Sequence, residues 1–474
     1  MVNFGFIDEW RPNPGKLTSW SVTPQSLEAA MRAPRHATPP SHQQEEYLRT
    51  AYRTASPQWR GSRLCTVVFT VPGVADLDAL TQTFNAFLRR HDTFSSWFAQ
   101  RDDGSIVRHV IDPDIIDVAP TEHGYLDSVE AIHAQVESGT PNALRWDCFT
   151  FGVIEHEGSF TLYGAVDHLH TDGMAQGLTC VDLLTLYGNV LSAGKAPSAP
   201  VDGHIAFSER ERAATAQLTW DSPKIKTWVD LLQRNGGDIP GFPADLGVTD
   251  ETTNSGSAFL DIELATEGQM LRFEQVCAEH GGRFIGGLFA AQALAEAELS
   301  GNDWYFGLTP ANTRATSGEA GSVGWYTSLV PVAFDVAPQA SFSSLVPVAQ
   351  QAQESGRELN DVSLYRAFEL VTPDSGIRTR PGWSARMLSF VDVRKMEGVE
   401  MFDKIDGGFF ASRGNSTEVY IWVNRFIDVT KLSVMFPDTP QAHAAIGRFQ
   451  EIFRGIFATV AAEGDYAMRV DVLS

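Results

Sequence analysis

Segments typical of β-strands and of α-helices alternate along the chain, and this alternation restricts the fold more than any other feature of the sequence. Leu64–Val71 (LCTVVFTV) has the β-branched and apolar character of a buried strand, and Pro72-Gly73 predicts a turn after it. Asp76 then stands at the position of a helix N-cap. The apolar residues that follow share one helical face: Leu77, Leu80, Phe84, Phe87 and Leu88. Strands and helices in alternation predict an α/β fold with mixed sheets.

The alternation occurs twice, once on each side of a stretch that opens rich in Gly, Pro and Ser. Upstream, the pattern predicts strands at 149–154 and 160–166 and a helix at 175–191. Downstream, it predicts strands at 258–264, 304–308, 329–334, 386–391, 419–426 and 431–436, and helices at 267–279, 284–299, 342–358 and 441–462. The predicted linker runs from Ser192 to about Ala213, so the 474 residues divide into domains 1–200 and 201–474. The residues before about Trp59 are expected to form an irregular arm.

Composition excludes several classes of function. The chain has 36 Lys and Arg against 59 Asp and Glu, a net charge of −23, and no basic run, so nucleic acid is not an expected partner. No apolar stretch approaches the ~18–20 residues that a transmembrane helix requires. The four cysteines form no C-x-x-C pair and the first ten residues do not resemble a secretory signal, so a cytoplasmic location is expected.

The most polar cluster of the first half is the loop Asp167–Gly173 (DHLHTDG), between a predicted strand and a predicted helix. His168, Asp172 and Gly173 form the pattern H-x-x-x-D-G. A neutral imidazole can act as a general base near pH 7 and take the proton of a hydroxyl or amine that attacks a thioester. Asp172 is expected to hold the loop through an ion pair with an arginine, and Gly173 to permit the turn.

A zinc site is the alternative interpretation of the same loop. His168, His170 and Asp172 form H-x-H-x-D, which resembles the first part of the metallo-β-lactamase-type site. The final histidine of that site is absent, because position 173 is Gly. This alternative predicts a zinc-dependent hydrolase.

Further motifs occur in an order that resembles the condensation-domain and chloramphenicol-acetyltransferase-like superfamily. They are Ser41–Gln44 (SHQQ), Arg90–Phe98 (RHDTFSSWF), the H-x-x-x-D-G loop and the stretch from Asn312 to Leu329. The resemblance implies two chloramphenicol-acetyltransferase-like lobes in a V-shaped pseudodimer with a central channel. It also implies that His168 is the catalytic base.

Within this superfamily, four segments look most like the actinobacterial polyketide-associated acyltransferases that build acylated trehalose lipids. These segments are WRPNPG at 10–15, RWDCF at 145–149, GWYT at 324–327 and WVNR at 422–425. Peptide-forming condensation domains usually carry a histidine directly before the catalytic one, whereas this chain has Asp167. The difference favours ester formation over amide formation.

The resemblance also suggests roles for arginines and aromatic residues. Arg90 and Arg314 lie in matching motifs, and each is a candidate for the ion pair with Asp172. Arg314, Trp325 and Tyr326 are candidates for substrate binding. Arg378 and Arg380, with Arg386 nearby, form a basic group that is either a receiver of donor phosphates or a solvated loop.

The sequence therefore predicts an acyltransferase that moves an acyl chain from a thioester, acyl-CoA or acyl-carrier protein, to a hydroxyl of a sugar such as trehalose. No cofactor or metal is expected, because the thioester is a cosubstrate. The resemblance also allows a polyketide synthase carrier protein as a partner. Besides the zinc hydrolase, the other alternative is a non-catalytic member of the fold that binds carrier proteins.

Overall fold

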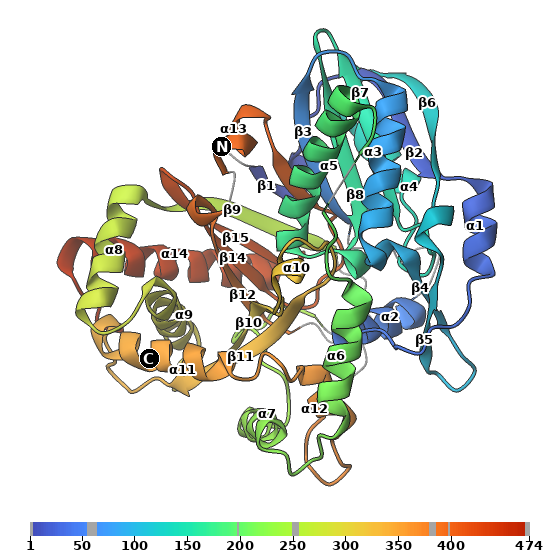
Figure 1. Ribbon diagram of the computed structural model, residues 1–474. Coiled ribbons are helices and arrows are strands. Elements are labelled where there is room, and N and C mark those ends of the chain that lie inside the picture. The colour runs from blue at the N-terminus through green and yellow to red at the C-terminus, as the bar shows by residue number, and fades with distance from the viewer. Residues whose placement is uncertain are drawn as a thin grey trace. The chain divides into compact units, whose positions relative to one another are not determined.

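The computed structural model describes residues 3–54, 64–196, 199–248, 256–378, 385–396 and 399–469 (Figure 1). The chain folds into two compact units. Unit 1 contains Met1–Gln217, Thr313–Thr327 and Gly398–Gly414, and unit 2 contains Leu218–Asn312, Ser328–Glu397 and Asn415–Ser474. The predicted division near residue 200 cuts the chain once, whereas here two later segments return to unit 1.

Unit 1 is built on a seven-stranded mixed sheet with strand order β1-β13-β3-β8-β7-β2-β6. The strands are β1 (Asn3–Phe6), β13 (Gly408–Ala411), β3 (Leu64–Pro72), β8 (Ser159–Asp167), β7 (Phe149–His156), β2 (Gly15–Val22) and β6 (Val118–Leu126). β7 and β8 form a hairpin, and β13 pairs parallel with β1 and antiparallel with β3. The Asp167 end of β8 leads directly into the polar loop, so the sheet fixes where that loop begins.

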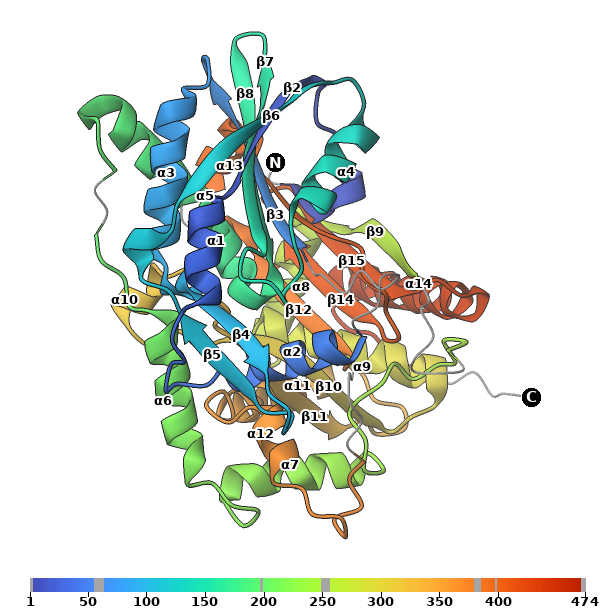
Figure 2. The ribbon, with the colours of Figure 1, turned by 90° about the vertical axis from the view of Figure 1, so that its right-hand side faces the viewer.

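Helices cover both faces of this sheet. α3 (Leu77–Arg90) and α5 (Gly173–Ala193) pack together on one face, as Figure 1 shows, over a core that includes the stacked rings of Phe84 and Phe151. α4 (Val129–Gly139) buries Ile132 and Val136 in a separate core with Leu17 and Tyr163. The hairpin of β4 (Ser96–Gln100) and β5 (Ile106–Val110) lies beside α2 (His42–Thr54) in Figure 2. The remaining helices of the unit are α1 (Pro24–Met31), α6 (His204–Ala216), α10 (Ser317–Ala320) and α13 (Val399–Lys404).

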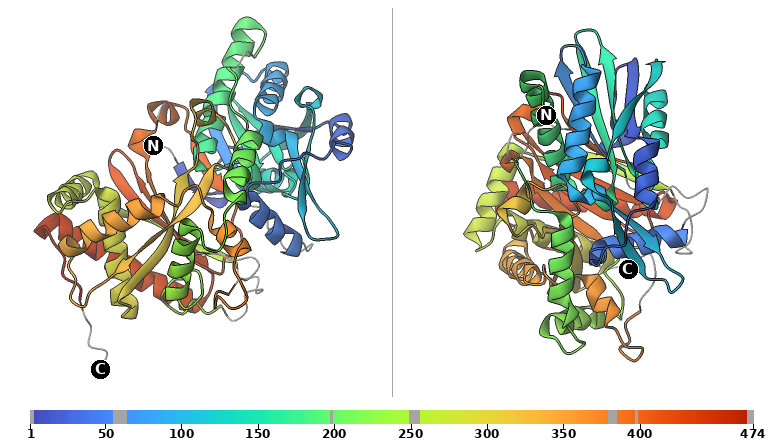
Figure 3. Two further views of the ribbon diagram at one scale, coloured as in Figure 1. Left: turned by 60° about the horizontal axis from the view of Figure 1, so that its bottom comes forward. Right: turned by 45° about the vertical axis from the view of Figure 1, so that its right-hand side comes forward.

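Unit 2 has a six-stranded mixed sheet with strand order β11-β10-β12-β14-β15-β9. The strands are β11 (Thr327–Asp335), β10 (Trp304–Asn312), β12 (Met387–Asp392), β14 (Tyr420–Arg425), β15 (Val429–Pro437) and β9 (Ser257–Thr266). The largest core of the unit joins these strands to four helices, seen together in Figure 3: α8 (Glu267–Glu279), α9 (Phe284–Ser300), α11 (Phe342–Arg357) and α14 (Pro440–Glu463). A second core joins Phe306 and Leu308 of β10 to α7 (Pro223–Arg234) and α12 (Leu364–Glu369).

The mixed α/β class is confirmed, and the helix 267–279 begins and ends where the pattern places it. Its start is fixed by a capping box of Thr266 and Gln269. Two expectations are wrong. The supposed irregular arm contains β2 and α2, and α2 begins with a reciprocal pairing of Ser41 and Gln44. The supposed linker contains α6, whose first N–H groups bind the carboxylate of Asp92 at 2.6 and 3.1 Å.

The start of α6 was not visible locally, because its cap comes from a residue far away in the chain, whereas the cap of α2 lies in its own sequence. The four cysteines are free thiols and buried. Within the described ranges, no helix combines the length and the apolar character that a membrane crossing requires.

Candidate functional site

The polar loop of unit 1 begins with a short 3₁₀ turn, His168–His170, directly after β8. The Asp167 carboxylate caps this turn by accepting the Leu169 N–H at 3.0 Å, and it also accepts the Tyr47 hydroxyl at 2.9 Å. Gln44 of α2 donates its side-chain amide to the Leu169 carbonyl at 2.9 Å. The turn that carries His168 is therefore held by side chains on both sides.

His168 is the partly exposed histidine of this turn. Its ring lies 4.3 Å from the ring of Trp325, centroid to centroid, at an angle of 50°. Trp325 in turn meets Tyr47 edge to face at 5.5 Å. The imidazole thus packs against the Trp325 ring and keeps part of its surface exposed, where a reactant can reach it.

His170 has the opposite environment. Its side chain is buried, and its Nδ1 lies 2.8 Å from the Thr93 hydroxyl. Burial, together with the positive charge of Arg108, lowers the pKa of His170 to about 3. The second histidine of the loop is therefore a neutral structural residue near pH 7.

Asp172 is the N-cap of α5 and is almost fully buried. One carboxylate oxygen accepts the Ala175 N–H at 2.8 Å, and the other accepts the Tyr326 N–H at 2.8 Å and the Thr327 hydroxyl at 3.3 Å. The guanidinium of Arg314 forms an ion pair with the same carboxylate at 3.1 Å. Asp172 thus joins the loop to the 313–327 segment. Both of its carboxylate oxygens are occupied by these contacts, so it is not a candidate for proton transfer.

These contacts also bear on the zinc hypothesis. Among the residues that the structure describes, no group of three or more His, Cys, Asp or Glu side chains is arranged to hold a metal ion. The His170 ring is turned to Thr93, and the Asp172 carboxylate is turned to Arg314. The donors that a zinc site on this loop requires do not converge on one point.

Of the two arginine candidates, Arg314 is the partner of Asp172. Its Nε donates to the Glu319 carbonyl and one Nη to the Ser322 carbonyl, both at 3.1 Å, and its guanidinium lies 4.4 Å over the Tyr326 ring. Only 2% of the side chain is exposed. Arg90 instead pairs with Asp182 of α5 at 3.0 Å.

The motif residues beside Arg90 have structural roles that the sequence did not reveal. His91 is fully buried, with its Nε2 2.8 Å from Asp182 and its Nδ1 accepting the Val323 N–H at 3.2 Å. Asp92 caps α6, as described above. The R-H-D triplet therefore connects α5, α6 and the 313–327 segment around the loop.

Two of the expected roles need correction. The Tyr326 side chain is completely buried and donates to Ser322 at 3.1 Å, so it supports the site and does not line it. Gly173 has an ordinary negative φ, and a Cβ at this position would meet open space. The turn itself does not require glycine, and residue 173 is exposed.

The basic group expected from Arg378, Arg380 and Arg386 does not form as a set. Arg386 is buried in unit 2, forms an ion pair with Glu296 and donates to the Phe306 carbonyl, so it is not available to a phosphate. Arg378 has 58% of its side chain exposed and pairs with Asp238 at 2.8 Å. Arg380 lies outside the described residues.

The buried imidazoles predict that the protein loses stability in mild acid. The pKa values of His170 and His204 are both lowered from 6.5 to about 3 by burial. Between pH 3 and 6.5 the unfolded chain binds protons that the folded chain excludes, so stability falls as the pH drops through 6.5. Each group contributes about 2 kcal/mol to the loss between pH 7 and pH 5. Burial raises the pKa of Glu418 to about 7, so this carboxyl offsets about as much as one of the two histidines over the same range.

Urea unfolding at the two pH values measures this loss. His170→Gln, which removes one titrating ring, should reduce the difference by about 2 kcal/mol. The same substitution at the exposed His443 is the control, and an equal reduction from both variants would contradict this account.

Gln44 carries a second prediction. Gln44→Leu leaves the buried Leu169 carbonyl without its donor and frees the His168 turn, so kcat should fall by about 10-fold to 100-fold with little change in KM. Gln44→Glu keeps an acceptor for the Ser41 N–H but loses the amide donor, and it should show a similar fall. The neighbouring Gln43→Leu should behave as wild type, and equal effects at Gln43 and Gln44 would refute the positioning role.

The sequence is similar to those of known proteins over nearly its whole length. The family model described as the condensation domain matches residues 58–374. The chain belongs to the condensation-domain family. It is 36% identical over 475 residues to the 2'-acyl-2-O-sulfo-trehalose (hydroxy)phthioceranyltransferase PapA1 of Mycobacterium tuberculosis, covering 99% of this chain and 90% of that protein. It is 34% identical over 469 residues to the trehalose-2-sulfate acyltransferase PapA2 of the same species, covering 97% and 98%.

Solved structures agree with the sequence comparison. The structure of PapA2 acyl transferase superposes with a TM-score of 0.89 at 33% identity, over 97% of this chain and all of that one. The condensation domain of the Monacolin K polyketide synthase MokA gives a TM-score of 0.69 at 14% identity, over 92% of this chain and all of that chain, which establishes the shared fold alone. The predicted family and fold are confirmed.

Proposed function

We propose that this chain is an O-acyltransferase that moves an acyl chain from a thioester to a hydroxyl of a trehalose-type sugar, with His168 as the general base. The observation that carries the proposal is the contrast within one loop. Asp167, His170 and Asp172 are buried and hold the loop in place, whereas His168 keeps exposed surface on the turn before α5. The full-length similarity to proteins named as trehalose acyltransferases supports the choice of reaction.

The proposed reaction needs only one protein group to move protons. His168 accepts the proton of the sugar hydroxyl while its oxygen attacks the thioester carbonyl carbon. The tetrahedral intermediate then expels the thiolate, which takes the proton from the imidazolium. The products are a sugar ester and a free thiol, and the imidazole returns to its neutral form.

Asp172 and Arg314 have a positioning role in this mechanism. The ion pair fixes the N-terminus of α5 and, through the Tyr326 N–H, the segment that carries Trp325. Trp325 packs on the His168 ring and restricts its orientation. A base that is held in one orientation loses less entropy when it reacts.

The donor is acyl-CoA or an acyl-carrier protein, such as the carrier protein of a polyketide synthase. Arg378 stays a proposed phosphate contact because more than half of its side chain is exposed, although it must leave Asp238 to bind. The overall charge of −23 disfavours a strongly acidic carrier protein, so we propose acyl-CoA as the preferred donor.

A panel of donors and acceptors tests the proposal. The purified protein is incubated with palmitoyl-CoA or a palmitoyl-carrier protein and with trehalose, trehalose 2-sulfate or glycine amide. Mass spectrometry should detect an ester of one of the two trehalose acceptors and no amide of glycine. Amide formation, or no acyl product with any pair, would refute the proposed function.

Gly173 carries a prediction that depends on this function. Residue 173 is exposed directly after the loop that carries His168, and we propose that a reactant packs against it. Gly173→Ala should fold normally, because an added Cβ meets no atom within 4 Å. Gly173→Leu should raise KM for one substrate by about tenfold or more while leaving the melting temperature unchanged. Normal kinetics for Gly173→Leu would contradict this contact with a reactant.

A further inference from the structure

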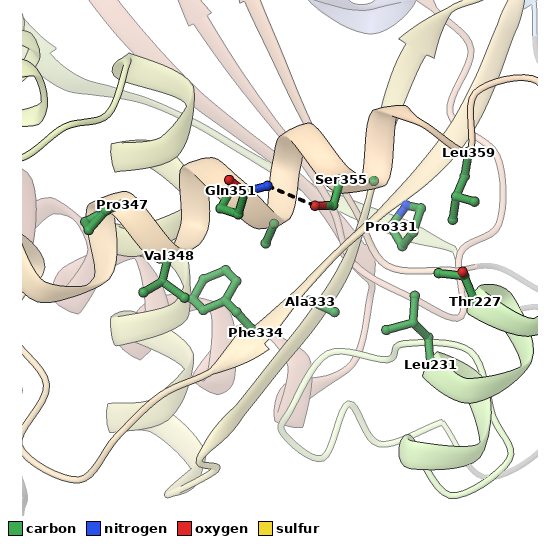
Figure 4. Close-up of a pocket in the computed structure, with 12 residues that line it drawn as sticks. Thr227, Leu231, Pro331, Ala333, Phe334, Pro347, Val348, Gln351, Ser355 and Leu359 are labelled. Atoms are coloured by element: carbon green, nitrogen blue, oxygen red, sulfur yellow. Dashed lines mark hydrogen bonds between the residues drawn. The ribbon is translucent and has the colours of Figure 1, made fainter. Parts of the chain in front are cut away.

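Unit 2 contains a pocket that is separate from the His168 loop (Figure 4). Its volume is about 620 Å³, within the range of about 300–1,000 Å³ that is typical of small-molecule sites. It lies beside β11, the edge strand of the six-stranded sheet, and between helices α7 and α11. The three elements border it on different sides, and it is open to solvent, with Val348 43% exposed.

The lining of the pocket is suited to a hydrocarbon. Leu231, Ala333, Phe334 and Val348 contribute apolar surface, and no lining residue carries a charge. The polar side chains already have partners inside the protein. Thr227 donates to the Pro223 carbonyl at 3.1 Å, and Gln351 donates to the Ser355 hydroxyl at 3.2 Å, as Figure 4 shows for the second pair.

A ligand that brings hydroxyl or charged groups into this pocket would lose its bonds to water and gain few in return. An alkyl chain has no such groups to satisfy. The chemistry of the lining therefore favours an alkyl chain as the occupant.

Strand addition by another polypeptide is disfavoured at the same place. An edge strand can pair with an incoming strand, but Pro331 lies within β11 and has no N–H to donate. A row of hydrogen bonds along the pocket floor would be interrupted at that residue. The floor of the pocket thus suits a molecule that needs no backbone pairing.

Charged residues stand at the two ends of α7, outside the lining. Lys224 pairs with Asp361 at 2.5 Å, and Arg234 pairs with Asp335. Both cations are already in ion pairs with carboxylates. They therefore do not favour a ligand with a carboxylate or phosphate head group. A neutral polar head group can remain in water while its chain enters the pocket.

We propose that this pocket binds the acyl chain of a neutral acylated sugar, as a site distinct from the one at His168. The identity of the sugar ester rests on the proposed function, whereas the preference for a neutral alkyl chain rests on the lining alone. Bound there, an acylated sugar is retained by residues of unit 2, none of which belongs to the His168 loop.

Photo-crosslinking of the full-length protein tests the proposal. The probe is a trehalose monoester whose acyl chain carries a diazirine, and peptide mass spectrometry locates the labelled residues. Label is expected in peptides from α7, β11 and α11, and trehalose monolaurate should compete with it while trehalose alone does not. Absence of label from these three elements would overturn the proposal.

Two substitutions block the pocket in different ways. Ser355→Trp fills it, and Val348→Asp places a charge on its lining. Each should reduce labelling of the pocket peptides at least tenfold. Arg357→Trp, on the same helix but outside the lining, is the control and should label as wild type. Unchanged labelling in both pocket variants would overturn the proposal.

Two further arms separate this inference from the proposed function. A diazirine fatty acid should label the pocket less than the sugar ester does, and stronger labelling by the acid would overturn the neutral occupant. His168→Ala should label the pocket as wild type does. If the wild-type protein labels the pocket but forms no sugar ester with any donor and acceptor pair, the proposed function is refuted and the alkyl site stands.

Discussion

Replacing His168 with alanine should slow acyl transfer by about 10²–10⁴-fold, which is the usual contribution of a positioned general base. The imidazole lies on the turn after β8, packs against Trp325 and keeps part of its surface exposed. The melting temperature and the binding of the thioester donor should therefore change little. Single-turnover release of thiol, with donor affinity measured separately, checks this expectation.

His170 supplies the matched control. His170→Asn removes the second imidazole of the loop but keeps a polar group near the Thr93 hydroxyl. It should lower the melting temperature, because His170 is buried, and it should lower the rate of acyl transfer far less than His168→Ala does. Equal loss of rate from the two substitutions, or loss of activity on adding a chelator, would favour the zinc-hydrolase hypothesis over the proposed acyltransferase.

Breaking the ion pair between Asp172 and Arg314 should lower the free energy of unfolding more than any other substitution proposed for this site. Both side chains are 2% exposed, so Arg314→Met leaves a carboxylate buried without its counter-charge. The expected loss is about 3–5 kcal/mol in the free energy of unfolding. For a unit of this size the melting temperature should fall by on the order of 10 °C.

The double variant Asp172→Asn, Arg314→Met distinguishes charge from packing. With both charges removed, much of the lost stability should return, because neither ion is left buried alone. Activity should stay low, since the Tyr326 N–H then loses its charged acceptor and Trp325 loses its fixed position. Additive losses of stability in the double variant would show that the two residues do not form a functional pair.

Local patterns predicted the elements well where their determinants are local. α3 begins at a cap that its own sequence supplies, since Asp76 accepts the Ala79 N–H at 2.9 Å. The loop after β8 was visible because a buried apolar strand ends in a run of polar residues. The position of His168 on that loop follows from the sequence, and so does its separation from His170 by a single residue.

Determinants that lie far apart in the chain were not predictable. Asp182 gives no sign within α5 that it pairs with Arg90 and lies against His91, both about 90 residues earlier. Arg386 belongs to a basic cluster in sequence, yet folding buries it beside Glu296. β2 was missed because Thr18 and Ser19 are polar residues that become buried in the sheet.

The ratio of thiol released to sugar ester formed tests the central claim most directly. The purified enzyme, a long-chain acyl-CoA and trehalose or trehalose 2-sulfate are combined, and both products are measured in the same reaction. We expect one ester for each thiol, no thiol release in the absence of sugar beyond a slow background, and loss of both products in His168→Ala. Rapid thiol release without ester would identify a thioester hydrolase and contradict the assignment of His168 as the base for a sugar hydroxyl.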